Sequence, residues 1–267
     1  MKNNDYIKNT DNISISIVTF RQRAHLIKKL IHQIRTHVPD NVDILLAING
    51  NNEELMPEDY RQEMLDLCKH YVNIYPIFCT EYKSLSKLWN TLTIFSNTEY
   101  NFIICDDVVY DNPHTLDIIK EYINQTNSGF FTINNQFSHF VVSKVLLHQL
   151  GYFDERFIGH GEEDGDMVHR YIEVFGNRMP NIQVQGLYNL ASYELRNEKI
   201  ENHIDNKPRF NREFALLKYR PDNNGIKGMS PIPVSKVIDD YQQYPHELFV
   251  LNNKHNIAKF DKVILDE

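Results

Sequence analysis

The sequence predicts an α/β fold in which helices flank a mostly parallel central sheet. From residue 13 to residue 110, short β-branched apolar runs alternate with longer segments of helical periodicity, which is typical of βαβ units. The chain has 267 residues, 42% of them hydrophobic, so it can bury a large core. No repeat and no linker-like composition divides the pattern. We therefore expect one principal globular domain.

The first half of the chain is predicted to alternate between strand and helix. Residues 13–20, ISISIVTF, form a β-branched apolar run that indicates a buried strand. Residues 23–38 repeat apolar side chains at helical spacing. The second strand, VDILLAI over 42–48, stops at the turn signal NGNN. Pro57 suits the first turn of a helix that continues to residue 71.

The alternation continues to the end of the βαβ pattern. Residues 72–78 are a strand whose proline indicates a sheet edge. A helix over 85–95 has an apolar face made of Leu85, Leu88, Trp89, Leu92 and Phe95. The fourth strand, YNFIICDD over 100–107, is apolar until it ends on two acids. A helix begins at Asn112-Pro113.

Further elements and the domain bounds follow from the remaining composition. We expect strands at 129–134, 137–143 and 181–187, and helices at 144–150 and 167–176, the last closed by Gly176. Residues 1–12 are polar and predict a disordered tail. The globular domain then covers 13–218, and 219–267 form a C-terminal extension packed on it.

Charge and cysteine content narrow the class of protein. The net charge of −8 argues against a nucleic-acid partner bound through bulk charge. No run of about 18 apolar residues is present, so we expect no transmembrane segment, and the N-terminus lacks a secretory signal. The three cysteines are scattered, which favours reduced thiols. We expect a cytoplasmic protein, with peripheral attachment to the inner face of the membrane left open.

Polar side chains follow three of the predicted strands. Residues 19–21, 49–51 and 106–107 each lie at the carboxyl end of a strand, where open α/β sheets bind ligands. Asp106 and Asp107 could be a turn or a helix cap. Their oxygens could instead hold Mg²⁺ or Mn²⁺ together with a substrate phosphate.

A second acidic group stands in GYFDERFIGHGEEDGD, residues 151–166. Six of these residues are carboxylates, and each makes its neighbours harder to ionise. Acids in the first turn of a helix interact well with its dipole, which accounts for Glu162 and Asp166. A carboxylate beside glycines could also act as a general base on a hydroxyl. Either the segment is a solvated helix start, or a positive group lies opposite it.

Three blocks in this order resemble the family 2 glycosyltransferases, which have the nucleotide-sugar-binding GT-A fold, a Rossmann-like sheet. The first is SISIVTFRQR, which looks like the family's first strand and the turn after it. The second is KLWNTLTIFSNTEYNFIICDDVVYDNP, which resembles the segment with the DxD-type metal motif. The third is LGYFDERFIGHGEEDGDMVHRYIEVFG, similar to the acceptor segment with its Glu-Asp pair. The resemblance covers about residues 13–190.

The resemblance implies transfer of a sugar from a nucleotide donor to an acceptor hydroxyl with inversion. Asp107 would hold Mn²⁺ or Mg²⁺ on the donor diphosphate, with Asp106 beside it as a metal and donor contact. Asp164 would deprotonate the acceptor, and Glu163 would hydrogen-bond its hydroxyls. The family's frequent first acid of DxD is here Cys105.

The same resemblance places the donor contacts. Thr19, Phe20 and Arg21 would line the nucleotide, with Asn49 and Asn90 nearby. Asn49 stands where an acid often reads the base. A histidine often completes the metal site, and Asn189 lies near the expected place, with His203 later in the chain.

We therefore expect a metal-dependent glycosyltransferase whose donor is a UDP-sugar and whose acceptor is a glycan or another hydroxyl compound. Its role would be surface polysaccharide or glycan synthesis, and its oligomeric state stays open. Two alternatives remain: a metal-dependent nucleotidyl- or phosphotransferase, and a non-catalytic module that binds nucleotide or carbohydrate.

Overall fold

The computed structural model describes residues 12–20, 23–50, 56–80, 82–157, 159–190, 211–212 and 215. These residues fall into two compact units. The sheet unit holds the described residues of Met1–Glu81, Leu92–Leu146 and Pro180–Tyr193. The α6 unit holds those of Tyr82–Thr91, Leu147–Met179 and Glu194–Glu267. The predicted extension over 219–267 lies outside the described residues, as does the predicted tail except for Asn12.

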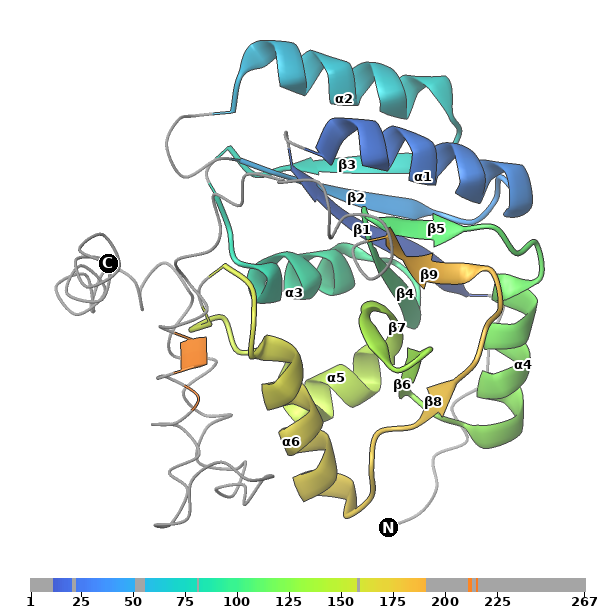
Figure 1. Cartoon of the computed structure of the whole chain (residues 1–267), viewed down its shortest axis with the longest axis vertical. Coiled ribbons are helices and arrows are strands. Elements are labelled where there is room, and N and C mark those ends of the chain that lie inside the picture. The colour runs from blue at the N-terminus through green and yellow to red at the C-terminus, as the bar shows by residue number, and fades with distance from the viewer. Residues whose placement is uncertain are drawn as a thin grey trace, which may run out of the picture. The chain divides into compact units, whose positions relative to one another are not determined.

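The sheet unit is built on a seven-stranded sheet with the order β3-β2-β1-β4-β7-β6-β8 (Figure 1). Its strands are β1 (Ile13–Phe20), β2 (Ile44–Asn49), β3 (Ile74–Phe78), β4 (Tyr100–Cys105), β6 (Phe130–Ile133), β7 (Gln136–Ser143) and β8 (Asn181–Ile182). The first four strands run parallel, and β7 is antiparallel to both of its neighbours. The predicted mostly parallel sheet is confirmed, with the proline-containing β3 at its edge.

A second, two-stranded sheet pairs β5 (Val108–Tyr110) with β9 (Leu187–Asn189) in antiparallel fashion. The sequence predicted one strand over 100–107 and one over 181–187, and both predictions were too long. Asp106 and Asp107 form a turn between β4 and β5. Gly186, with a φ of 79°, makes the turn before β9, a conformation that glycine adopts at little cost. The register places Asn189 opposite Val108, directly after the acidic turn.

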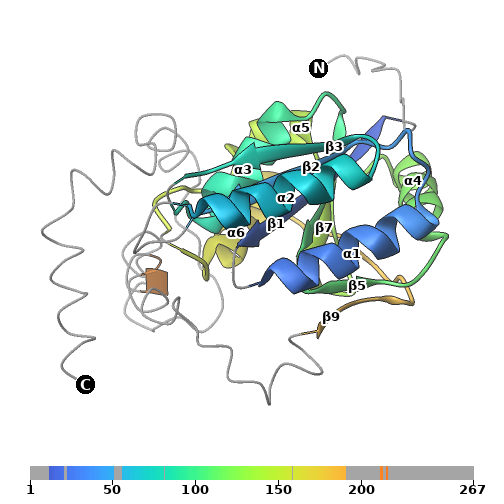
Figure 2. The ribbon, with the colours of Figure 1, turned by 90° about the horizontal axis from the view of Figure 1, so that it is seen from above.

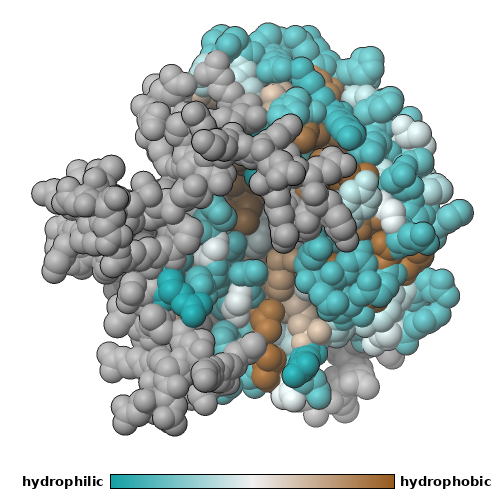
Figure 3. All heavy atoms as spheres, viewed as in Figure 1, coloured by the Kyte–Doolittle hydropathy of each residue, from teal (hydrophilic) through white to brown (hydrophobic). Residues whose placement is uncertain are grey.

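Two helices, α1 (Ala24–His37) and α2 (Glu58–His70), cover one face of the parallel strands (Figure 2). The buried side chains of α1 are Leu26, Ile27, Leu30, Ile31 and Ile34, which matches the predicted helical spacing. The outer face of α2 is hydrophilic (Figure 3), while its Tyr60, Met64 and Cys68 are buried. The core of the sheet unit is therefore formed by apolar stripes packed on β-branched strands.

The remaining helices are α3 (Leu85–Phe95), α4 (Thr115–Thr126), α5 (Lys144–Leu150) and α6 (Glu163–Phe175). The division between the two units falls within α3, after Thr91. Trp89 is buried against the ring of Phe153, with centroids 4.8 Å apart, as expected for a core aromatic. The prediction for Phe95 was wrong: as the last residue of α3 it is 65% exposed.

Helix α6 starts at Glu163, four residues before the predicted start, and ends at Gly176 as predicted. Gly176 has a φ of 68°, and its N–H donates to the carbonyl of Ile172 over 2.7 Å. Glu163, Asp164 and Asp166 lie in the first turn, where the helix dipole favours negative charge. No helix in the described part of the chain has the length and apolar character needed to cross a membrane.

Candidate functional site

The carboxyl ends of β2, β1 and β4 lie side by side in the sheet unit. Phe20 is paired with Asn49 across β1 and β2, and Val18 with Cys105 across β1 and β4. Thr19, Asn49 and the Asp106–Asp107 turn therefore lie at the same edge of three adjacent strands. The predicted convergence of strand ends is confirmed, although Arg21 lies outside the described residues.

Arg23 supplies the positive charge at this edge. Its Nη1 donates to Oδ1 of Asp106 over 2.9 Å and to Oδ2 of Asp107 over 3.1 Å. Its guanidinium carbon lies 5.0 Å from the ring centroid of Phe20, a cation–π contact. Sequence reasoning placed Arg23 only at a helix start. Its position could have indicated this role, because Arg23 is a basic residue shortly after the first strand, whose carboxyl end was expected to bind a ligand.

Asp107 is held by groups that come from β9. Nδ2 of Asn189 donates to Oδ1 of Asp107 over 3.0 Å, and the backbone N–H of Leu190 donates to its carbonyl over 2.8 Å. Asn189 thus contacts the acid that the resemblance assigned to the metal. His203, the later histidine, lies outside the described residues.

Asp106 is the more deeply buried of the two acids, with an exposed fraction of 3%. Burial raises its pKa to about 7, with the nearby charge of Asp107 acting in the same direction and Arg23 opposing it. Its Oδ2 has no hydrogen bond of ordinary geometry among the described residues, although the Thr19 hydroxyl lies near enough to lower the pKa of this carboxyl. A buried carboxylate oxygen without a partner is costly unless a ligand or ion completes it.

The other predicted nucleotide contacts are half-buried or buried. Phe20 is half-buried beneath Arg23, whereas Thr19 and Asn49 are buried. Asn90, in the α6 unit, donates to the carbonyl of Phe153 over 2.9 Å and to Oε1 of Glu155 over 3.0 Å. Its Oδ1 accepts from the N–H of Phe153. These hydrogen bonds would have to break before Asn90 could contact a nucleotide.

In the α6 unit, four of the six acids of the 151–166 segment have a basic partner. The pairs are Asp154 with Arg156 at 2.7 Å, Glu155 with Lys87 at 3.0 Å, Glu162 with Arg212 at 3.1 Å and Asp166 with Arg170 at 2.7 Å. These ion pairs explain why so many acids can lie close together in this segment, because basic side chains of the same unit neutralise four of them.

Glu163 and Asp164 are the two acids of the segment without a basic partner in the described part of the chain. Asp164 is half-buried, and its Oδ1 accepts from the N–H of Gly165 over 2.8 Å. Glu163 is 4% exposed, and its Oε2 has no hydrogen-bond partner among the described residues. Burial, followed by repulsion from Asp164, raises the pKa of Glu163 to about 8.

The glycines before α6 have a conformational role. Gly159 and Gly161 have φ values of 67° and 100°, which side-chain-bearing residues rarely adopt. Glu162 is also left-handed, with a φ of 71°, and precedes the first residue of the helix. A non-glycine residue in this region stores strain that the surroundings must offset. The loop thereby turns sharply and presents Glu163 and Asp164 at the helix start.

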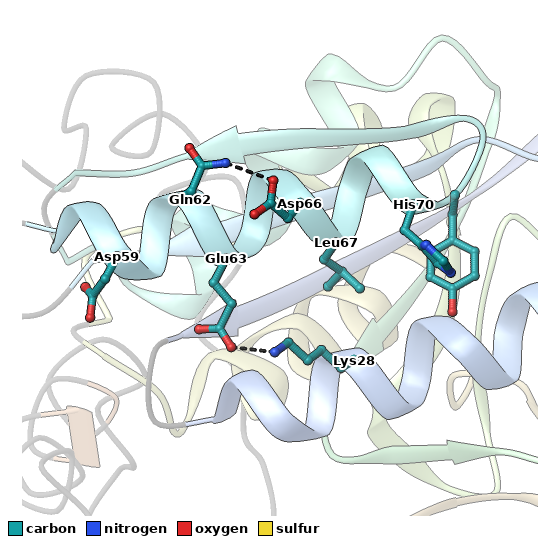
Figure 4. A pocket seen from close by; sticks show the side chains of 8 residues that line it. Lys28, Asp59, Gln62, Glu63, Asp66, Leu67 and His70 are labelled. Carbon is teal, nitrogen blue, oxygen red and sulfur yellow. Dashed lines mark hydrogen bonds and ion pairs between the residues drawn. The ribbon is translucent and has the colours of Figure 1, made fainter.

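A groove of about 710 Å³ lies between α1 and α2 (Figure 4). Lys28 of α1 and Glu63 of α2 face each other in it, with Nζ and Oε1 2.5 Å apart. Its other lining residues are Asp59, Gln62, Asp66, Leu67, His70 and Tyr71. None of the residues predicted for catalysis, donor binding or metal binding lines this groove.

Comparison with known proteins identifies relatives of the same architecture. The model of a family described as "Glycosyltransferase like family 2" matches residues 77–227. No curated protein matches the chain by sequence. Among solved structures, the mannosyltransferase PcManGT from Pyrobaculum calidifontis, in complex with GDP-Man and Mn²⁺, is similar with a TM-score of 0.54 and 11% identity. The match covers 96% of this chain and 79% of that chain.

Two further structures show the same fold. TarS 1–349 of S. aureus in complex with UDP has a TM-score of 0.52 and 13% identity, over 82% of this chain and 76% of that chain. GalNAc-T7 with UDP, GalNAc and Mn²⁺ has a TM-score of 0.55 and 10% identity, over 93% of this chain and 58% of that chain. Against the longer TarS structure, the match spans only 36% of that chain. At these identities the likeness establishes the fold, which is that of GT-A glycosyltransferases.

Proposed function

We infer the function from the family, because this chain belongs to the family described as "Glycosyltransferase like family 2". We propose that it moves a sugar from a nucleotide donor to an acceptor hydroxyl with inversion. A UDP-sugar is the proposed donor and a glycan or other hydroxyl compound the proposed acceptor, in surface polysaccharide or glycan synthesis. One observation carries the catalytic part: Glu163 and Asp164 are the two acids of their segment that the described residues leave without a basic partner.

Asp164 is the proposed general base. It is half-buried, so a hydroxyl compound can approach it, and its position in the first turn of α6 fixes its backbone. The acceptor oxygen would form a bond to the anomeric carbon as the bond from that carbon to the diphosphate breaks. The proton of the acceptor hydroxyl would pass to Asp164. Attack from the face opposite the leaving group inverts the anomeric centre.

Glu163 is proposed to orient the acceptor. With its pKa raised to about 8, its carboxyl group is largely protonated at neutral pH. A protonated carboxyl group can donate one hydrogen bond and accept others, which suits a sugar hydroxyl. The partner-free Oε2 provides the atom for this contact.

The carboxyl ends of β1, β2 and β4 in the sheet unit form the proposed binding site of the sugar nucleotide. Thr19, Phe20, Arg21 and Asn49 are the proposed nucleotide contacts, together with Asp106. The contact of Asn90 with the nucleotide stays a prediction, and the present hydrogen bonds of Asn90 do not support it. Structures of similar fold contain UDP or GDP-Man, which supports a nucleotide-sugar for this chain.

The carboxylate oxygens at these strand ends are suitable ligands for a divalent cation. Asp106 and Asp107 offer hard carboxylate oxygens, and Oδ2 of Asp106 is buried without a partner among the described residues. Mn²⁺ or Mg²⁺ held there would stabilise the negative charge that develops on the departing diphosphate. Cys105 is a poor ligand for either ion, so we assign the metal to Asp107 with Asp106 beside it. The Mn²⁺ in two structures of similar fold supports a divalent cation for this chain.

A donor screen tests the function. The full-length protein is incubated with a panel of sugar nucleotides and Mn²⁺, and hydrolysis or transfer is measured with and without the metal. We expect UDP release with at least one UDP-sugar and none after chelation. Binding of nucleotide without any turnover across the panel would favour the non-catalytic module instead. Transfer of phosphate or nucleotide in place of sugar would favour the nucleotidyltransferase class.

Two substitutions separate the proposed roles. Asp164→Asn should retain UDP binding and lower the transfer rate by roughly 10²–10⁴-fold, the usual contribution of a general base. Asp107→Ala should lose metal-dependent UDP binding in calorimetry. Asp117→Asn is the matched control, because this acid has a side chain 77% exposed on α4. Full transfer by Asp164→Asn would remove Asp164 from the base role.

A further inference from the structure

We infer that Arg23 is the exchangeable counter-ion of the Asp106–Asp107 pair, which bridges both carboxylates and must be displaced when a divalent cation binds between them. The inference rests on the metal role of Asp107 in the proposed function. It makes Arg23 a residue that sets the metal affinity of the free site.

Most carboxylate oxygens of Asp106 and Asp107 already accept hydrogen bonds. Arg23 donates to one oxygen of each acid, and Asn189 donates to the second oxygen of Asp107. Three of the four oxygens therefore accept N–H bonds, and only Oδ2 of Asp106 lacks a partner among the described residues. A divalent cation coordinates through the same lone pairs that now face N–H groups. A cation that bridged Oδ1 of Asp106 and Oδ2 of Asp107 would take the place that Nη1 of Arg23 now holds, so the two compete for it.

Charge sets Arg23 against a divalent cation as well. When both carboxyl groups are ionised, the guanidinium of Arg23 leaves a single negative charge at this partly buried place. A divalent ion beside Arg23 would meet a like charge at close range, where the local dielectric is lower than in water. When Arg23 moves away, the carboxylates of both Asp106 and Asp107 can interact with the divalent ion. Metal binding and the Arg23 contact therefore compete, as two cations compete for one anionic site.

Arg23 is held by fewer hydrogen bonds than Arg170, a structural arginine of this chain. Arg170 uses Nε on Asp166 and Nη1 on two backbone carbonyls, and its side chain is 3% exposed. Arg23 holds its acids through Nη1 alone, and its Nε has no partner among the described residues. Its side chain is 21% exposed, so it has a route toward solvent. Such a contact can exchange without loss of the surrounding structure.

The test is metal binding without nucleotide. Mn²⁺ is titrated into the full-length wild type, Arg23→Gln and Lys29→Gln, and free Mn²⁺ is followed by electron paramagnetic resonance. Lys29 is an exposed residue of α1, so its variant removes an equal charge without touching the acids. We expect Arg23→Gln to bind Mn²⁺ about tenfold or more tightly than wild type, and Lys29→Gln to match wild type. Adding Asp107→Asn to Arg23→Gln should abolish the gain.

Equal or weaker Mn²⁺ binding by folded Arg23→Gln overturns the inference and leaves the metal assignment standing. No Mn²⁺ binding by wild type or variant, even with UDP present, instead removes the metal role in the proposed function and the inference with it.

Arg23→Lys, which keeps the charge, covers the case in which Arg23→Gln does not fold. The arginine Nε–H signal that is missing from the NMR spectrum of Arg23→Lys is that of Arg23. Mg²⁺ is then added to the wild type, and this signal is followed. The Arg23 resonance should shift while that of Arg170 stays in place. Calorimetric Mg²⁺ binding with an unmoved Arg23 resonance contradicts the exchange.

Discussion

The guanidinium of Arg170 lies on the carboxylate of Asp166 one helical turn away, with Nε donating to Oδ2 over 2.9 Å and Nη2 2.7 Å from the same oxygen. Both side chains are almost fully buried. Arg170 also donates to the carbonyls of Leu150 and Tyr152, so one side chain connects the first turn of α6 with the end of α5 and the residues that follow it. Asp166 is therefore a structural acid, although it stands two residues from the proposed base.

This pairing predicts opposite results for two acids of the same helical turn. Asp166→Asn leaves the buried charge of Arg170 without its counter-ion, and we expect the free energy of unfolding to fall by about 3–5 kcal/mol. Asp164→Asn removes an equal charge from the same helix start, so it controls for the dipole term, and should change stability by about 1 kcal/mol or less. Urea denaturation measures both. Equal losses for the two variants would show that Arg170 does not depend on Asp166.

The features that depend on local pattern could be predicted from the sequence. The apolar spacing of 23–38 predicted α1 because one face of that helix packs on the sheet. β-branched runs predicted β1 and β2 because both strands are buried on both faces. Because parallel strands end at the same edge, the order of these elements was enough to place Thr19, Asn49 and Asp106 together.

The contacts between distant residues could not be predicted in this way. Arg23 precedes Asp106 by 83 positions, and Asp107 precedes Asn189 by 82. Neither pair has a sequence signal, because each depends on which strands become neighbours. The start of α6 was missed for another reason: its first turn is acidic and lacks the apolar spacing that was used to place the helix. Glu162 in the left-handed region is likewise set by its surroundings and not by local preference.

Asn90 should act through the loop that it holds. Asn90→Ala leaves the N–H and carbonyl of Phe153 without their side-chain partner in a buried place, and we expect a loss of about 1–3 kcal/mol in the free energy of unfolding. UDP affinity, measured by calorimetry well below the melting temperature, should stay within about twofold of wild type. A large loss of UDP affinity with stability unchanged would restore Asn90 to the donor contacts that the resemblance implied.

Asn189 should control the charge balance around Asp107. Asn189→Asp replaces an N–H donor with a third carboxylate, so without metal it adds repulsion and removes a hydrogen bond to a charged group. We expect the free energy of unfolding to fall by about 1.5–3 kcal/mol. Because the new oxygen is also a metal ligand, saturating Mn²⁺ should raise the melting temperature of this variant more than that of wild type. Asn189→Ala, which adds no ligand, is the control and should lack the extra response to Mn²⁺.

Glu163 should make the stability of the protein fall as pH rises. In the unfolded chain its pKa is near 4.5, and burial raises the folded value to about 8. Below the unfolded value both states carry the proton, so the contribution of Glu163 is fully present there and does not change with pH. Between the two values only the folded state holds the proton, so the contribution of Glu163 is lost by about 1.4 kcal/mol per pH unit as pH rises. Above the folded value the loss is complete and constant.

Glu163→Gln removes this dependence, because glutamine has the shape of the protonated acid and does not titrate. Wild type and variant should have similar free energies of unfolding near pH 4.5, and the variant should become progressively the more stable one up to about pH 8. Chemical denaturation across this range, with Glu162→Gln as a control at the neighbouring, ion-paired position, measures the difference. Parallel pH profiles for wild type and Glu163→Gln would mean that Glu163 is already ionised in the folded protein, and its proposed role as a hydrogen-bond donor to the acceptor would be lost.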